Sequence, residues 1–129
     1  MRKGIVLFFL LFFINCSGNY TARDKLNFAV YSYNTNIRWG KFEKAKDFVA
    51  NRFIIEHYKE LLNKEDIRIS EFDIVETKMT KEKAYVVVRI NWYSLRTAQS
   101  YTTLLEQRWE EREGEWLLVE ERVLDGKPL

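Results

Sequence analysis

The sequence is poor in the residues that cross-link small domains or build metal sites. It has one cysteine, Cys16, and one histidine, His57, among 129 residues. A lone cysteine has no partner for a disulfide within the chain. A lone histidine excludes a metal cluster built on several histidines, so we expect no metal and no cofactor. We interpret His57, in a predicted helix, as a partly exposed surface residue and not as a general base.

An excess of one charge is also absent. The chain has 21 basic and 19 acidic residues, and two of the basic ones, Arg2 and Lys3, stand at the N-terminus. Without these two the rest of the chain is formally neutral, with both signs interspersed. Domains that bind nucleic acids concentrate positive charge on one surface, so we expect no nucleic-acid partner.

The N-terminus has the pattern of an export signal. Two basic residues precede an unbroken apolar run over residues 5–14, which ends just before Cys16. A charged start followed by such a run is typical of a signal peptide. The run is about half as long as the roughly 20 residues that cross a bilayer, which argues against a lasting membrane span. We predict that residues 1–15 are a signal peptide.

Cys16 follows this run directly, in the position of the lipid-modified cysteine of bacterial lipoproteins. The sequence Phe13-Ile14-Asn15-Cys16 resembles their lipobox, but it departs from the usual pattern because neither Ile14 nor Asn15 is small. The resemblance implies lipid on Cys16, cleavage before it and a domain held at a membrane of the cell envelope. Ser17 resembles residues that permit sorting to the outer membrane rather than retention in the inner one.

A secreted eukaryotic protein is the competing interpretation of the N-terminus. Asn19-Tyr20-Thr21 matches the acceptor pattern for N-glycosylation. Small secreted eukaryotic domains usually carry paired cysteines, however, and this chain has only one. We therefore favour the lipoprotein.

The rest of the chain divides into a short tether and one domain. Residues 16–23 are polar and contain glycine, which predicts a flexible tether, and residues 24–129 suffice for a single domain. Apolar residues recur at helical spacing from Asp24, the expected N-cap, up to an interruption at residues 39–40. A second helical pattern follows from Phe42 and either runs on or restarts as far as Leu62.

After these helices the apolar pattern changes to alternation, which predicts strands at 67–79, 84–93, 101–111 and 116–123. Irregular spacing in the first strand indicates a bulge or bend. The second strand is the clearest, and its apolar face comprises Ala84, Val86, Val88, Ile90 and Trp92. A two-residue turn at Glu113-Gly114 places Trp109, Trp116 and Leu118 on one sheet face, which we expect to look towards the helices.

This order predicts an α+β domain in which N-terminal helices pack on a curved four-stranded antiparallel sheet. The sequence resembles the nuclear transport factor 2-like (SnoaL-like, cystatin-like) superfamily, which implies a cone-shaped single domain with a cavity between helices and sheet. Members include isomerases, dehydratases, hydrolases and non-enzymatic binding domains, so the fold does not choose the function. The resemblance covers about residues 24–124 and rests on Tyr31, Arg38-Trp39-Gly40-Lys41-Phe42-Glu43-Lys44-Ala45, Ala84-Tyr85-Val86-Val87-Val88, Arg108-Trp109 and Trp116-Leu117-Leu118.

Aromatic residues are the candidates for lining a pocket, because aromatic walls with polar tips are typical of small-molecule sites, although each also suits a core. No catalytic residue is assigned. Asp47 and Asp73 are the carboxylates nearest to inward positions, but the first belongs to a charged helix face and the second can alternate outward on a strand. The pocket candidates are Tyr31, Tyr33, Trp92, Tyr93, Trp109 and Trp116.

The sequence therefore predicts an envelope lipoprotein whose domain is non-enzymatic and binds a small apolar ligand or a partner protein. One alternative is a small cavity enzyme of the SnoaL type, with Asp47 or Asp73 as base and a tyrosine as proton donor. Another is a structural protein without a ligand, and a homodimer stays open. An ionisable side chain that points into an enclosed pocket would favour the enzyme.

Overall fold

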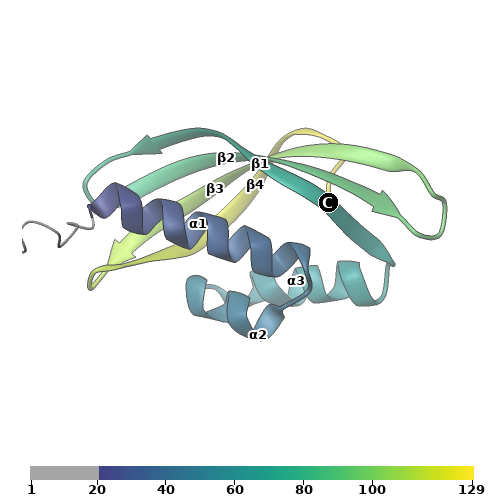
Figure 1. The fold of residues 1–129 in the computed structure, drawn as a ribbon, viewed down its shortest axis with the longest axis horizontal. Coiled ribbons are helices and arrows are strands. Elements are labelled where there is room, and N and C mark those ends of the chain that lie inside the picture. Colours follow the sequence, from purple (N-terminus) through teal and green to yellow (C-terminus); the bar gives the residue numbers. More distant parts are fainter. Residues whose placement is uncertain (1–20) are drawn as a thin grey trace, which may run out of the picture.

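The computed structural model describes residues 21–129, so the predicted signal peptide and Cys16 lie outside the described part. The helical elements come first in the chain and gather on one face of a curved sheet (Figure 1). They are α1 (Ala22–Arg38), α2 (Phe42–Ala45), the 3-10 helix η2 (Lys46–Phe48) and α3 (Arg52–Asn63).

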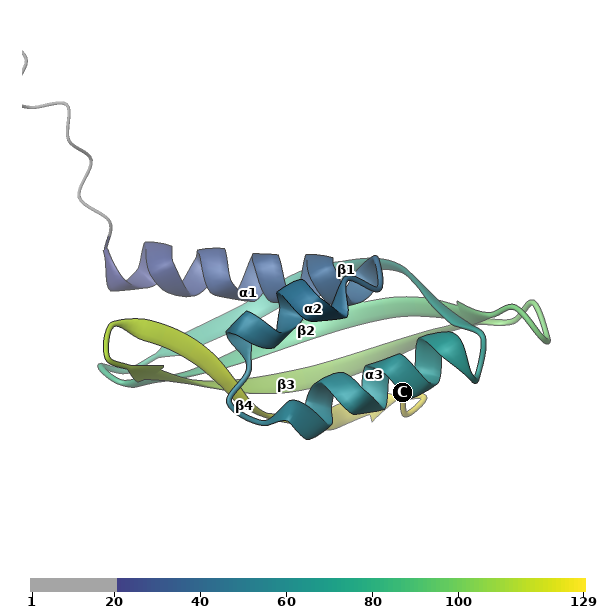
Figure 2. The same ribbon diagram turned by 90° about the horizontal axis from the view of Figure 1, so that it is seen from below.

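Four strands form the sheet, in the order β1-β2-β3-β4, and every neighbouring pair is antiparallel. Figure 2 shows α1, α2 and α3 side by side in one layer over this sheet. The predicted α+β architecture is confirmed. The strands are β1 (Ile67–Met79), β2 (Lys83–Ser94), β3 (Ser100–Arg112) and β4 (Glu115–Gly126).

The start of α1 differs from the prediction that Asp24 is its N-cap. The N-cap is Thr21, whose side chain accepts a hydrogen bond from the Asp24 amide at 3.1 Å, while the Asp24 carboxylate accepts one from the Thr21 amide at 3.2 Å. This reciprocal pair is a capping box, in which the acidic residue occupies the third helical position. The helix therefore begins at Ala22, inside the segment predicted as tether.

The second helical region restarts instead of running on. Between η2 and α3 the chain is extended, because Val49 forms a parallel bridge with Leu118 and the Ala50 amide donates to the Leu118 carbonyl at 2.9 Å. Asn51 then caps α3 by accepting from the Phe53 amide at 3.0 Å. This short bridge fixes η2 against β4.

The strand predictions are confirmed in position and in facing. β1 carries two register shifts, as its irregular apolar spacing indicated. In the β3–β4 hairpin, Arg112 pairs with Glu115 and Trp109 pairs with Leu118 across a turn in which Glu113 and Gly114 both have positive φ. A turn with positive φ at both central residues matches the twist of the strands that it joins.

One hydrophobic core lies between the helices and the sheet. It includes Val88 and the whole predicted face of β2, and all of its side chains come from residues between Leu26 and Leu118. The part of the chain from residue 21 onward thus carries its own core, which is the requirement for independent folding.

Candidate functional site

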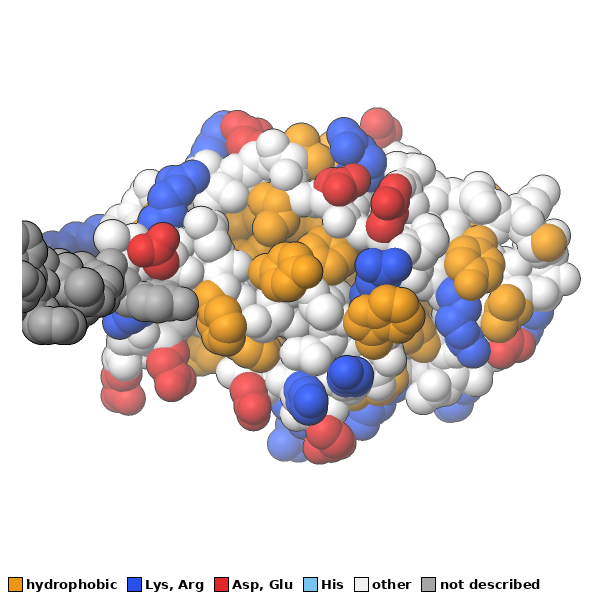
Figure 3. Space-filling model, in the orientation of Figure 1, with side chains coloured by type: hydrophobic (Ala, Val, Ile, Leu, Met, Phe, Trp, Pro, Cys, Tyr) orange, Lys and Arg blue, Asp and Glu red, His pale blue; other side chains and the backbone are white. Residues whose placement is uncertain are grey.

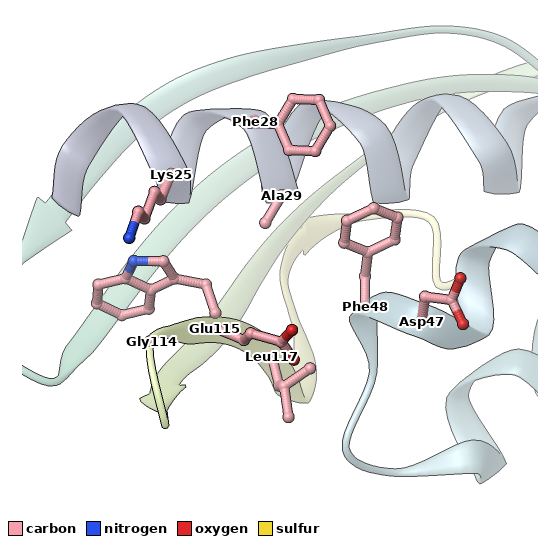
Figure 4. Close-up of a pocket in the computed structure, with 9 residues that line it drawn as sticks. Lys25, Phe28, Ala29, Asp47, Phe48, Gly114, Glu115 and Leu117 are labelled. Carbon is pink, nitrogen blue, oxygen red and sulfur yellow. The ribbon is translucent and has the colours of Figure 1, made fainter. Parts of the chain in front are cut away.

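A groove of about 550 Å³ runs between the N-terminal half of α1, η2 and the β3–β4 hairpin (Figure 4). Small-molecule sites typically have volumes of roughly 300–1,000 Å³, so its size suits a ligand. The lining residues are Lys25, Phe28, Ala29, Asp47, Phe48, Gly114, Glu115, Trp116 and Leu117.

Two phenylalanines form the apolar wall of this groove. Phe28 of α1 and Phe48 of η2 meet edge to face, with ring centroids 6.4 Å apart and an interplanar angle of 62°. In Figure 4 the side chains of Ala29 and Phe48 point into the space between α1 and the hairpin. Ala29 and Trp116 are buried, whereas Phe28 is 60% exposed. The wall therefore offers aromatic surface that the domain itself does not cover.

Two contacts between distant segments position the walls of the groove. The Trp116 indole Nε1 donates to the Ala22 carbonyl at 3.2 Å, which ties the hairpin to the first turn of α1. At the other side, the bridge between Val49 and Leu118 places η2. Both contacts involve backbone atoms or a buried indole, so the fold itself sets the position of the two walls.

The rim of the groove is charged. Lys25 comes from α1, Asp47 from η2 and Glu115 from the start of β4, and all three are exposed. In Figure 4 the Asp47 carboxylate points away from the Phe48 ring. Within residues 21–129 these three charges form no ion pair with one another. An apolar floor with charged groups at the edge suits a ligand with an apolar body and a polar end.

A hydrogen-bonded polar cluster lies between the helices and β3–β4. Gln107 Nε2 donates to Glu121 Oε2 at 2.7 Å, and Tyr58 Oη donates to Glu121 Oε1 at 2.8 Å. Asn34 and Gln107 exchange two hydrogen bonds, at 2.9 and 3.2 Å. Each oxygen of the Glu121 carboxyl group thus has a donor supplied by the fold.

Burial governs the ionisation of this cluster. It raises the pKa of Glu121 above the ordinary value of a carboxyl group, although the hydrogen bonds from Tyr58 and Gln107 act in the opposite direction. Burial also raises the pKa of Tyr58 and of Tyr33 well above the usual value, and the negative charge of Glu121 adds to both shifts. Glu121 does not line the groove. Tyr58, Asn34 and Gln107 are buried and Glu121 is half-buried, so the cluster is a hydrogen-bonded part of the fold at the edge of its interior.

The six aromatic residues predicted to line a pocket do not come together in one place. Tyr33, Trp92 and Trp109 are buried in the core, where Tyr33 packs edge to face on Trp109 at 5.9 Å. Trp116 does line the groove. The remaining two do not line the groove.

Tyr31 and Tyr93 are those two residues. Tyr31 projects outward from α1 with its ring 5.8 Å from that of Phe72. Tyr93 is half-buried on the sheet face turned away from the helices, where it pairs with Arg68 of β1. No buried carboxylate stands beside either tyrosine in the described residues; the half-buried carboxyl group of Glu121 contacts Tyr58 instead.

The candidate carboxylates and the histidine have surface positions. Asp73 lies on the outer sheet face, 4.0 Å from Arg89, and Asp47 lies at the groove rim. His57 is exposed, as predicted, with Nε2 3.0 Å from the Leu129 carbonyl oxygen. Within residues 21–129 no group of His, Cys, Asp or Glu side chains is arranged to hold a metal ion.

Two members of these sites were missed from the sequence for different reasons. Gln107 could have been found, because strict alternation back from Trp109 puts it on the buried face. Glu121 could not, since a bulge opposite Arg108 and Trp109 leaves Val119 unpaired and turns Glu121, not Glu120, inward. Alternation counted from Trp116 and Leu118 gives the opposite answer.

Comparison with known proteins places this arrangement among solved folds. A cystatin-like protein of unknown function from Nostoc punctiforme superposes with a TM-score of 0.62 at 9% identity, covering 80% of this chain and 91% of that one. An NTF-2-like protein of unknown function from Shewanella oneidensis gives 0.62 at 15% identity, over 80% and 98%. The chain has an NTF-2-like, cystatin-like fold.

The intermembrane space region of the chloroplast protein ARC6 also superposes on this chain, with a TM-score of 0.55, 12% identity and coverage of 83% of this chain and 98% of that one. At such identities the likeness shows the fold alone. No family model and no curated protein matches the sequence. None of the helices among the described residues is long and apolar enough to cross a membrane.

Proposed function

We propose that this protein is a lipid-anchored protein of the bacterial cell envelope that binds a small apolar ligand in the groove between α1 and the β3–β4 hairpin. The observation that carries the binding role is the aromatic wall of Phe28 and Phe48 over the buried floor of Ala29 and Trp116. The export and anchoring role rests on the N-terminal sequence, with lipid on Cys16 and sorting to the outer membrane.

The ligand class follows from the lining. Aromatic and aliphatic side chains cover most of the groove, and the charges of Lys25, Asp47 and Glu115 lie at its edge. Such a site gains free energy by removing apolar surface from water, at roughly 25 cal/mol per Å². We therefore expect a molecule with a hydrocarbon or aromatic body and one polar end.

A cavity enzyme is the second candidate, because Glu121 combines a raised pKa with a neighbouring tyrosine hydroxyl, as catalytic acids do. The geometry favours binding over catalysis. Both carboxyl oxygens of Glu121 accept hydrogen bonds from Tyr58 and Gln107, and the residue does not line the groove. A general acid needs to reach its substrate, within hydrogen-bond distance or through one water.

The binding role is tested by titrating the purified domain with a fluorescent long-chain fatty acid, after native mass spectrometry for a ligand retained from the cell. Phe28→Glu places a charge on the exposed wall of the groove and should weaken binding about tenfold or more, since burial of a phenyl side chain is worth about 1.5–3 kcal/mol. Phe53→Glu is the matched control, because Phe53 is 76% exposed on α3 and does not line the groove. Equal affinity in both variants would contradict the site.

The anchor is tested separately in cells. Cys16→Ser should abolish labelling by a radioactive or clickable fatty acid and release the protein from the membrane fraction, because Cys16 is the only thiol in the chain. Ser17→Asp is the matched control for sorting, since it keeps the thiol and should leave the labelling intact. Persistent membrane association of the Cys16→Ser protein would overturn the anchor.

A further inference from the structure

Helix α1 presents aromatic side chains on the side opposite to its buried stripe. Its inward residues include Val30 and Tyr33, whereas Phe28 and Tyr31 are 60% and 62% exposed, and Trp39 at its C-terminal end is 62% exposed. In Figure 3 hydrophobic side chains gather over the middle of this face of the molecule. We call Phe28, Tyr31 and Trp39 the α1 aromatic face. Three large rings on one helix exceed the isolated apolar side chains that any surface carries.

Cations flank these rings. The Arg38 guanidinium lies over the Trp39 ring, 4.6 Å from its centroid, and Lys41 is exposed just beyond it. Lys25 stands one turn before Phe28. The acidic residue on this side of the helix, Asp24, is engaged in the capping box with Thr21. Rings of Trp, Tyr and Phe with neighbouring Lys and Arg are the chemistry by which a helix lies in the interface of a membrane.

The chain preceding α1 indicates what covers this face. Four residues lie between Cys16 and the N-cap Thr21. A lipid on Cys16 therefore keeps the start of α1 within about 18 Å of the bilayer, which is five steps along the chain at ~3.5 Å each. That reach is shorter than α1 itself, whose 17 residues span about 25 Å at 1.5 Å each. A domain held this closely by the end of one helix can lay that helix on the lipid.

From the aromatic face and the tether length we infer that α1 rests on the membrane surface, with Tyr31 and Trp39 in the headgroup region. The inference rests on the proposed anchor at Cys16. The arrangement fixes the orientation of the domain, because the sheet then points away from the lipid and the groove beside Phe28 lies next to the bilayer. An apolar ligand could then pass between membrane and groove with little contact with water.

The fluorescence of Trp39 can report contact between the α1 aromatic face and lipid. The other tryptophans, Trp92, Trp109 and Trp116, are all buried. The protein from residue 16 onward, which contains the whole core, is coupled through its single thiol to a maleimide lipid. The vesicles are of phosphatidylcholine and phosphatidylglycerol with brominated acyl chains. We expect Trp39 emission to shift to shorter wavelength and to be quenched by bromine, relative to the same protein on unbrominated vesicles. Trp39→Phe should show neither change.

A pair of variants separates the face from the anchor. Tyr31→Ser should reduce the bromine quenching of Trp39, whereas Phe53→Ser on α3, which Figure 2 shows on the far side of α2 from α1, should leave it unchanged. Equal quenching of Trp39 by aqueous acrylamide with and without vesicles would overturn the inference. The inference would also be overturned if Trp39 were protected from acrylamide without lipid and this protection grew with protein concentration. That result would assign the face to a second copy of the chain.

The two proposals fail in different experiments. Chemical coupling supplies the anchor whether or not cells acylate Cys16. The vesicle measurement therefore tests only the contact of the α1 aromatic face with lipid. The cellular experiment with Cys16→Ser tests the anchor and says nothing about Trp39.

Discussion

The hydroxyl of Tyr58 donates a 2.8 Å hydrogen bond to Glu121 across 63 residues of sequence, from the middle of α3 to the second half of β4. Gln107 of β3 donates to the other oxygen of the same carboxyl group. The carboxyl group of Glu121, in β4, thereby joins α3 to β3 and β4. Its ionisation should therefore affect the stability of the whole domain.

The first prediction concerns pH. Because burial raises the pKa of Glu121, the folded state keeps the proton on this group to higher pH than the unfolded state does. In the unfolded state the pKa of a Glu side chain is about 4.3. Below about 4.3 both states are protonated and the full stability is present; as pH rises through the folded pKa, the contribution of this group is lost. Glu121→Gln removes the ionisation and keeps an amide that can hydrogen-bond with Tyr58 and Gln107.

We expect the free energy of unfolding of the native protein, relative to Glu121→Gln, to fall as pH rises from about 4.3 towards neutrality. Urea unfolding of both proteins at a series of pH values measures the difference. Glu120→Gln is the matched control, since the Glu120 carboxylate is exposed and pairs with Arg108 at 3.0 Å. A constant difference between native protein and Glu121→Gln across this range would show that Glu121 titrates normally.

The second prediction concerns Trp109, which is 0% exposed and packs edge to face on Tyr33. Trp109→Ala should lower the free energy of unfolding by roughly 3–5 kcal/mol, as a large-to-small change in a core. Trp39→Ala, at an exposed position, should change it by no more than about 0.5 kcal/mol. Chemical denaturation measures both, and comparable losses would contradict the placement of the two indoles.

The third prediction concerns the central strand β2. Val88→Asp should abolish folding, because it puts an unpaired charge into the core at a cost of several kcal/mol against a total stability of about 5–15 kcal/mol. Val75→Asp, on the exposed edge of β1, should leave a cooperative thermal transition. Circular dichroism distinguishes the two, and a folded Val88→Asp domain would show that the strand face is misassigned.

The elements that the sequence predicted well are those in which one physical requirement dominates. Alternation in β2 is strict because one face of the strand is covered by helices. The burial of every second residue from Ala84 to Trp92 could therefore be predicted from the sequence. The hairpin was predictable because Gly114 allows positive φ at a two-residue turn, and this fixed the pairing of Trp109 with Leu118.

The candidate site was less predictable, because it depends on contacts between distant segments. Phe48 faces the groove only because Val49 pairs with Leu118, and nothing in the local helical spacing signals that bridge. The pattern of α1 likewise shows which residues face inward. It does not show whether the outward Phe28 and Tyr31 meet solvent, a groove or a lipid surface.

The fourth prediction compares Gly114 and Gly126, which have the same positive φ of 83° but different surroundings. A Cβ at Gly114 would meet nothing within 4 Å, so Gly114→Ala adds only backbone strain, about 1 kcal/mol. At Gly126 the same Cβ would collide with the carbonyl oxygen of Thr102, which is backbone of β3 and cannot rotate away.

Gly126→Ala should therefore cost more than Gly114→Ala and should displace the end of β4, with loss of the 3.2 Å hydrogen bond from the Lys127 amide to the Thr102 carbonyl. Urea unfolding measures the two costs, and hydrogen exchange at the Lys127 amide reports the displacement. An equal loss of unfolding free energy in both variants, with the Lys127 amide still protected, would contradict this prediction. It would mean that the end of β4 can accommodate a side chain without losing its pairing with β3.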